Sequence, residues 1–243
     1  MSAHAQTSDF AAAAPDELGF DARRGFDCLV APVVLILLAP VLAAIAIAIW
    51  IESDGPIFFS QVRLGRGGQH FRLHKFRKFH EQGQPGGLAV TLRNDPRMTR
   101  MGRLLERTKL DEMPQLWNIL VGEMALVGPR PESLAFADCF SGAYGGVLKH
   151  RPGIFGPCQT VFRNENQFYE AGCDPEEFYR TVLFPLKGQI DLAYFPNRSV
   201  VSDAGWMVLS VLAVCGWSFL PGDAVRRLEG VESWAQEFTR TTI

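Results

Sequence analysis

The segment CLVAPVVLILLAPVLAAIAIAIWI, residues 28–51, decides the fold of this 243-residue chain. It holds no charged side chain, and Asp27 and Glu52 bracket it. Its 24 residues exceed the roughly 20 that a helix needs to cross a bilayer, and they exceed the apolar core of a cleavable signal peptide. The segment therefore predicts a helix in the membrane.

Two prolines leave the path of this helix open. Pro32 lies near its start and Pro40 near its middle. A proline inside a helix removes a backbone hydrogen bond and bends the helix. The segment therefore either spans the membrane with a kink or returns to the face from which it entered. Composition alone favours spanning, with Arg23 and Arg24 in the cytoplasm and the rest of the chain outside it.

Basic residues after the segment favour a helix that returns over one that spans the membrane. No acidic residue occurs between Asp54 and Glu81, whereas six cations do: Arg63, Arg66, Arg72, Lys75, Arg77 and Lys78. Basic segments near a membrane favour its anionic, cytoplasmic side. Because Arg23 and Arg24 precede the segment, both of its ends are expected on that side. This predicts a re-entrant helix hairpin over residues 20–52, with its break at Pro40.

A second row of cations, formed by Arg97, Arg100, Arg103 and Arg107, follows at helical spacing. It suits a solvent-exposed face, a nucleic-acid surface or a phosphate site. The net charge of −2 and the apolar segment argue against nucleic acid. Like charges at this spacing repel each other, so we expect an anionic partner, either lipid headgroups or a phosphorylated substrate held by arginine.

Composition describes the remaining chain as an ordinary folded domain. Hydrophobic residues make up 47% and charged residues 21%, which excludes a wholly disordered chain. The five cysteines include no C-x-x-C pair, which predicts a reducing compartment without disulfides or structural zinc.

The pattern of turns and apolar residues predicts one mixed α+β domain, mostly helical, over residues 53–220. A β-hairpin is expected near residues 57–73, and an apolar stretch over residues 200–220 suits the membrane interface or a buried helix. The other expected segments are a mobile tail (1–19), a flexible loop (81–94), two helical pieces (97–120), a third helical stretch (134–150), an irregular or strand-like stretch (152–166), an amphipathic helix (175–190) and a C-terminal extension (221–243).

The densest motif is TKLDEMPQLWNILVGEMALVGPRPE, residues 108–132. Asp111 and Glu112 are adjacent, so on a helix they point about 100° apart and cannot face each other as an acid–base pair. Pro114 belongs in a first helical turn, which places Asp111 at or next to the helix N-cap. Capping would explain an isolated Asp-Glu pair. It does not explain the arginine row that ends here or the Gly-Pro-Arg-Pro run at residues 128–131.

With these motifs the sequence resembles the monotopic polyprenyl-phosphate phosphoglycosyl transferases, a family of bacterial sugar transferases. The likeness covers about residues 20–220, and larger members carry a multi-helix domain in front, so the chain is expected to be a minimal catalytic unit. The matching stretches are GPIFF (55–59) with Gln61 and Arg63, KFR (75–77), Asp95 with Arg97 and Thr99, LDE (110–112) with PQL (114–116), VGPRP (127–131) and RPGI (151–154).

The resemblance implies a monotopic membrane enzyme with a small cytoplasmic catalytic domain, at the inner membrane of a bacterium. Asp111 would attack the sugar-proximal phosphate of a nucleotide sugar, expected to be a UDP-sugar, and release nucleoside monophosphate. Polyprenyl phosphate would then accept the sugar phosphate. The product would be the first lipid-linked unit of an exopolysaccharide, capsule or O-antigen. Membrane lipid is a further expected partner, and nucleic acid is not.

The resemblance also implies the site residues. Mg²⁺ would bridge the phosphates with Asp111 as its protein ligand, and Glu112 would serve either the metal or the acceptor. The residues expected to bind substrate phosphates are Lys75, Arg107, Arg130, Arg151, Gln159 and Arg163.

Three departures from the family pattern bear on substrate details. Ala39-Pro40 replaces a Ser-Pro step in the membrane helix, and Glu106 stands where many members carry arginine. Gly-Pro-Cys-Gln at residues 156–159 replaces Gly-Trp-Ala-Gln.

Two other functions compete with the enzyme. One is a catalytically silent membrane scaffold that binds anionic lipid or glycan-assembly partners, and the intact Asp111, Glu112 and Arg130 argue against it. The other is a bitopic protein with an extracytoplasmic domain, which the absence of a disulfide pattern disfavours.

Overall fold

A computed structural model describes residues 22–80, 95–169 and 173–216 of the chain. It contains many helices and two small two-stranded sheets, in agreement with the predicted mostly helical α+β class. The predicted tail (1–19), loop (81–94) and C-terminal extension (221–243) lie outside the described residues.

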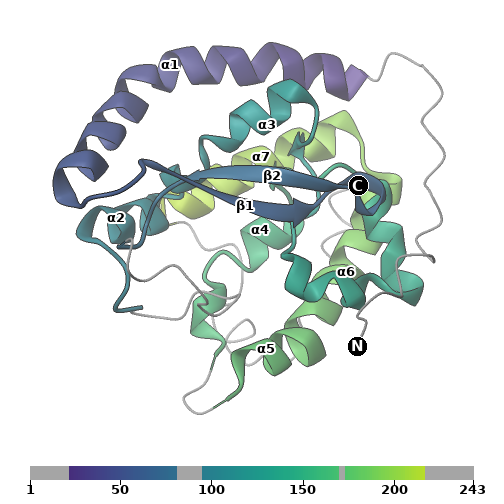
Figure 1. Ribbon diagram of the computed structural model, residues 1–243. Helices are drawn as coiled ribbons and strands as arrows, with labels where there is room; N and C mark the ends of the chain where they lie inside the picture. The colour runs from purple at the N-terminus through teal and green to yellow at the C-terminus, as the bar shows by residue number, and fades with distance from the viewer. Residues whose placement is uncertain (1–21, 81–94, 170–172, 217–243) are drawn as a thin grey trace, which may run out of the picture.

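The apolar segment forms one continuous helix, α1 (Ala22–Glu52), with Pro32 and Pro40 inside it. Figure 1 shows that α1 passes over α3 and then bends toward α2. Prolines are the common cause of such bends. In the described part of the chain, α1 is the one helix that is long and apolar enough to cross a membrane. Residues 22–52 form a single bent helix and not two separate helices. The return of this helix to the membrane face from which it entered stays a prediction.

Polar contacts attach the first turns of α1 to the rest of the domain. The guanidinium group of Arg24 donates to the carbonyl oxygen of Leu120 at 2.8 Å. The buried carboxylate of Asp27 accepts from the backbone N–H of Leu126 at 3.1 Å.

The other end of α1 is attached to the same domain. The carboxylate of Glu52 accepts from the backbone N–H groups of Arg100 and Met101, at 2.6 and 2.8 Å. These N–H groups open helix α2, where a negative charge is stabilised. Both ends of the apolar helix therefore rest on one globular body.

The predicted hairpin is confirmed. Strands β1 (Phe58–Leu64) and β2 (His70–Phe76) pair antiparallel, from Phe58 opposite Phe76 to Leu64 opposite His70. The short turn η1 (Arg66–Gly68) joins them, and positive φ angles of 66° and 74° at Gly67 and Gly68 explain the glycines there.

A second sheet brings two of the motifs together. Strand β3 (Ala125–Val127) runs parallel to β4 (Gly153–Phe155). Their ends approach so closely that a Cβ atom on Gly153 would lie 2.1 Å from the backbone nitrogen of Gly128. Both glycines are therefore required for the Gly-Pro-Arg-Pro and Arg-Pro-Gly-Ile motifs to meet.

The expected helices are present with some changes. The two pieces at residues 97–120 are α2 (Arg100–Thr108) and α3 (Gln115–Val121), with the turn η3 (Leu110–Glu112) between them. The third stretch is two 3₁₀ segments, η4 (Leu134–Phe140) and η5 (Gly142–Lys149). The remaining elements are α4 (Pro157–Val161), η6 (Glu165–Gln167), α5 (Pro175–Phe178), the π-turn η7 (Tyr179–Leu183), α6 (Phe184–Tyr194), η8 (Phe195–Asn197) and α7 (Val200–Val214).

One face of α1 is buried and the other is open. Ala31 packs with Phe71 and Leu73 of the hairpin and with Leu116 and Ile119 of α3. The opposite face exposes large apolar side chains, and exposed apolar residues also occur on α3 and α7: Leu29, Ile36, Leu37, Trp50, Trp117, Val121, Val201 and Val208. Apolar exposure of this extent is typical of a membrane-contacting surface.

Candidate active site

The site is built around η3, the turn between α2 and α3. Lys109 ends α2 in the left-handed conformation, with φ 58° and ψ 15°. It is the one non-glycine residue with a positive φ in the described part of the chain. For a residue with a Cβ atom this region costs roughly 1 kcal/mol. The reversal at Lys109 turns Asp111 and Glu112 toward strand β2.

Asp111 is almost fully buried, at 1% exposure. Its Oδ2 lies 3.3 Å from the ammonium nitrogen of Lys78. Its Oδ1 is buried and has no hydrogen-bond donor among the described residues. A buried carboxylate oxygen without a donor is unfavourable unless a ligand completes it.

The prediction that Asp111 lies at or next to the N-cap is wrong. The N-cap of α3 is Pro114, with no side-chain cap, and Asp111 lies in the preceding 3₁₀ turn. The left-handed residue Lys109 adds this turn before the helix, so the carboxylate faces Lys78 rather than the N–H groups of α3.

Glu112 is held by two cations. Its Oε1 lies 2.9 Å from Nζ of Lys75 and 3.9 Å from Nη1 of Arg130. Burial acts to raise the pKa of Glu112, but the charges of Lys75 and Arg130 outweigh it and hold the pKa well below its usual value. Glu112 is therefore ionised at any physiological pH. Burial lowers the pKa of Lys75, although Glu112 opposes that effect.

Gln159 joins the turn before Arg130 to strand β4. Its side-chain amide donates to the carbonyl oxygens of Gly128 and Gly153, at 2.9 and 3.0 Å. These bonds tie together the two turns that the glycines bring into contact. Gln159 lines the cavity described below, yet its N–H₂ group already has two backbone partners.

The three other predicted phosphate-binding arginines have different surroundings. Arg163 donates to the carbonyl oxygens of Arg107, at 2.7 Å, and of Ala213, and so joins the end of α2 to the end of α7. Both Arg107 and Arg163 line the cavity. Arg151 does not line it. The backbone of Arg151 instead lies against Gly128.

A cavity of about 1370 Å³ is lined by most of these groups, although not by Asp111 or Arg151. One part of its wall is charged and includes Lys75, Lys78, Glu112 and Arg130. Another part is apolar and comes from α1 and α7, with the side chains Val30, Val34, Leu38, Met207 and Val211. The cavity therefore suits a ligand that combines phosphate with an apolar chain.

Sequence reasoning missed several polar residues of the wall. Lys78 was visible only as a member of a basic run, and Lys109 only as part of the motif at residues 108–132. Lys187 and Glu165 form an ion pair at 2.5 Å, and Lys187 also donates to the hydroxyl of Tyr179 at 3.2 Å. No local signal could have found that pair, because 22 residues separate its members.

The carboxylates of this site could contribute to binding of the expected magnesium ion. No cluster of three or more His, Cys, Asp or Glu side chains that could hold a metal occurs in the described residues. Mg²⁺, however, needs only one or two carboxylates when substrate phosphates supply further oxygens. The carboxylate of Asp111, whose Oδ1 has no donor within the described chain, could serve as one such ligand.

Known proteins are similar in sequence to this chain. The family profile for bacterial sugar transferases matches residues 20–216. A UDP-N-acetylgalactosamine-undecaprenyl-phosphate N-acetylgalactosaminephosphotransferase of Aeromonas hydrophila is 35% identical over 192 residues, which cover 75% of this chain and 44% of that protein. A UDP-glucose:undecaprenyl-phosphate glucose-1-phosphate transferase of Escherichia coli K12 is 39% identical over 193 residues, 78% of this chain and 39% of that protein.

A third relative matches over most of its length. The exopolysaccharide production protein ExoY of Rhizobium meliloti is 31% identical over 213 residues, 82% of this chain and 87% of that protein. The chain thus spans less than half of the first two relatives and most of the third.

Proposed function

The chain belongs to the bacterial sugar transferase family, and we propose that it transfers a sugar phosphate from a UDP-sugar to undecaprenyl phosphate. The observation that carries the proposal is the buried carboxylate of Asp111, whose Oδ1 has no donor in the described chain and which lies beside cavity-lining cations. The relatives' names include two donor sugars and exopolysaccharide production, so initiation of a surface polysaccharide is the proposed role.

The proposed reaction has two displacements at one phosphorus atom. Oδ1 of Asp111 attacks the sugar-proximal phosphorus, and the bond from that phosphorus to the oxygen of the uridine monophosphate breaks. The monophosphate leaves with the electron pair. A phosphate oxygen of undecaprenyl phosphate then attacks the same phosphorus, forms the diphosphate and releases the Asp111 carboxylate.

The cations around Asp111 suit this chemistry. Lys75 and Arg130 hold Glu112 ionised and lie on the cavity wall, where the charge of the attacked phosphate would develop. The apolar wall from α1 and α7 would hold the lipid chain of the acceptor. Glu112 would act through the metal or through the acceptor phosphate.

We propose Mg²⁺ as the cofactor, held by Asp111. When bound, it would neutralise charge on the phosphate oxygens. Turnover should therefore stop in excess chelator and return when Mg²⁺ is added, while thermal unfolding stays unchanged. Full activity in chelator would refute a required metal.

We place the enzyme at the cytoplasmic face of the inner membrane, with α1 entering and leaving from that face. Two observations support this: both ends of α1 bind the same domain, and the outer face of α1 is apolar and exposed. UDP-sugars are cytoplasmic, so the cavity must open on that side.

The test measures uridine monophosphate release by the purified chain with a panel of UDP-sugars and undecaprenyl phosphate. We expect release with at least one sugar, no release by Asp111→Asn and severe loss in Glu112→Gln. Asp138→Asn is the matched control, because Asp138 is an exposed surface residue. Near-normal turnover in Asp111→Asn would exclude the covalent step, and no release with any sugar would favour the silent scaffold.

A further inference from the structure

The cavity wall carries far more positive than negative charge. Ten lysine and arginine side chains line it, against five aspartate and glutamate side chains. Adding the buried Asp111 leaves four cations in excess. Like charges that share a cavity repel one another, so such an excess favours an anionic ligand.

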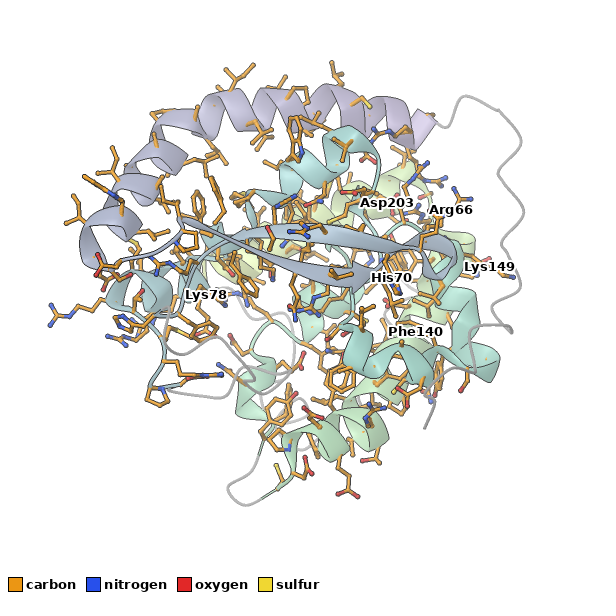
Figure 2. All side chains as sticks on the ribbon, viewed as in Figure 1. Arg66, His70, Lys78, Phe140, Lys149 and Asp203 are labelled. Atoms are coloured by element: carbon orange, nitrogen blue, oxygen red, sulfur yellow. The ribbon has the colours of Figure 1, made fainter. Side chains whose placement is uncertain are left out.

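Two of these cations lie beside the carboxylate pair and have no role in the function proposed above. Lys78 belongs to the segment after β2, and Lys109 belongs to the turn before η3. Each lines the cavity. Figure 2 shows Lys78 beside α2, far from the surface residue Lys149.

Lys78 is held firmly by its backbone. Its carbonyl oxygen accepts from the N–H of Thr99 at 2.9 Å. Gly102 packs against it so closely that a Cβ atom there would lie 2.1 Å from the same oxygen. Its ammonium group meets Oδ2 of Asp111, whereas Oδ1 is buried and has no donor among the described residues. Lys78 therefore fixes which oxygen of Asp111 is free.

Lys109 differs because it forms no ion pair within 4 Å with any residue that the structure describes. Burial lowers its pKa, while the nearby Glu112 and Asp111 oppose that effect and Arg130 and Lys78 add to it. Its left-handed backbone would be better served by glycine, the usual residue at a helix end of this kind. The lysine at this position places an unpaired ammonium group in the site, although its backbone is strained where glycine would not be.

We propose that Lys109 binds the diphosphate of the donor by a contact that persists when no metal is bound, and that Lys78 positions Asp111 beside it. Lys109 supplies the unpaired charge that meets the diphosphate. Lys78 is a positioning residue that orients Asp111 toward the phosphorus. The inference rests on the proposed function, because it assigns the donor diphosphate to this cavity.

The test measures binding of UDP and UMP to the full chain in detergent, by calorimetry in excess EDTA. Wild type should bind UDP more tightly than UMP. Lys109→Gly should raise the Kd for UDP about ten-fold or more, as expected for loss of a charge-assisted contact, and change the Kd for UMP much less. Lys109→Arg should recover most of the affinity for UDP, and Lys149→Ala should behave like wild type.

The same variants separate a binding role from a structural one. Lys109→Gly should unfold at the same temperature as wild type or a higher one, because glycine relieves the left-handed strain. Lys78→Ala should lower kcat more than it raises KM, since its main contact is with Asp111.

The outcomes distinguish this inference from the function. Normal monophosphate release together with unchanged UDP binding by Lys109→Gly would overturn the inference alone. No UDP binding by wild type in EDTA would also overturn it. Loss of UDP binding in the variant, when wild type releases no monophosphate from any sugar, would support the diphosphate site and remove the transferase function.

Discussion

Glu112 lies between two cations at different distances, and the difference predicts what each cation does. Lys75 is 2.9 Å away and only 17% of its side chain is exposed, whereas Arg130 is 3.9 Å away and 37% exposed. Lys75 therefore serves mainly to hold Glu112. Arg130 retains N–H groups that can reach a phosphate in the cavity.

We expect Arg130→Ala to lower kcat/KM for the UDP-sugar by about 100-fold, the usual effect of removing a charge-stabilising donor. Arg66→Ala should change it less than about two-fold, because Arg66 lies in the hairpin turn and donates to the carbonyl oxygen of Lys149, away from the cavity. Initial rates of monophosphate release would decide, and equal losses in the two variants would contradict the assignment.

A second residue-scale prediction concerns Asp191, which is buried beneath the site. The thiol of Cys158 donates to its Oδ1 at 3.0 Å, and burial raises the pKa of Asp191 to about 7. In the unfolded chain the pKa of an aspartate is about 3.9. Between these two values the folded chain binds the additional proton, so its stability falls as the pH rises from about 4 to 7.

Asp191→Asn should remove this dependence, because an amide does not ionise and its oxygen can still accept from Cys158. The melting temperature should therefore rise relative to wild type more at pH 8 than at pH 5. The control Asp138→Asn should not reproduce this pattern, since Arg180 lowers the pKa of Asp138 by hydrogen bonding. Parallel melting curves of wild type and Asp191→Asn at both pH values would contradict the prediction.

At the scale of elements, the sequence predicts the helices and strands that depend on residues close together in the chain. The hairpin β1–β2 and the helices α2 and α3 follow from turn residues and apolar spacing, and they appear where expected. The amphipathic stretch at residues 175–190 is helical but contains the π-turn η7. Pro185 has no N–H to donate to the preceding turn, which accounts for that irregularity.

The site could be predicted only in part, for a related reason. Asp111, Glu112 and Arg130 stood out because they lie in dense motifs, and the structure brings Glu112 and Arg130 together. The left-handed backbone of Lys109 carries no sequence signal, since such positions usually hold glycine. Asp111 was wrongly predicted at a helix N-cap because the turn that Lys109 adds before α3 could not be foreseen.

The bend of α1 is an element-scale feature with a testable cause. Replacing Pro40 by leucine restores a backbone hydrogen bond and should straighten the helix. Since polar contacts hold both ends of α1, a straighter helix should pull Glu52 away from the start of α2. We expect Pro40→Leu to lose most of its activity, measured per amount of membrane-bound protein. Pro32→Leu is the control, and equal losses in both would contradict a special role for Pro40.

At the scale of the whole molecule, α1 and the globular body determine the topology together. A helix that spans the membrane would carry its two ends to opposite faces. Here Arg24 and Glu52, near opposite ends of α1, both bond to the same domain. The cations that follow α1 also favour the cytoplasmic side. We therefore expect Arg24, before the apolar segment, and Arg63, after it, on the same cytoplasmic side.

Single cysteines in an otherwise cysteine-free chain test this directly. Ala22 and Asp54 are better positions than Arg24 and Arg63. Ala22 begins α1, Asp54 follows it and both are exposed, whereas both arginines form hydrogen bonds. An impermeant thiol reagent should label neither position in intact spheroplasts and both after permeabilisation. Labelling of one position alone from outside would show a spanning helix. In Pro40→Leu we expect a fraction of the molecules to give that pattern, because a straightened apolar helix of 31 residues is long enough to cross the bilayer.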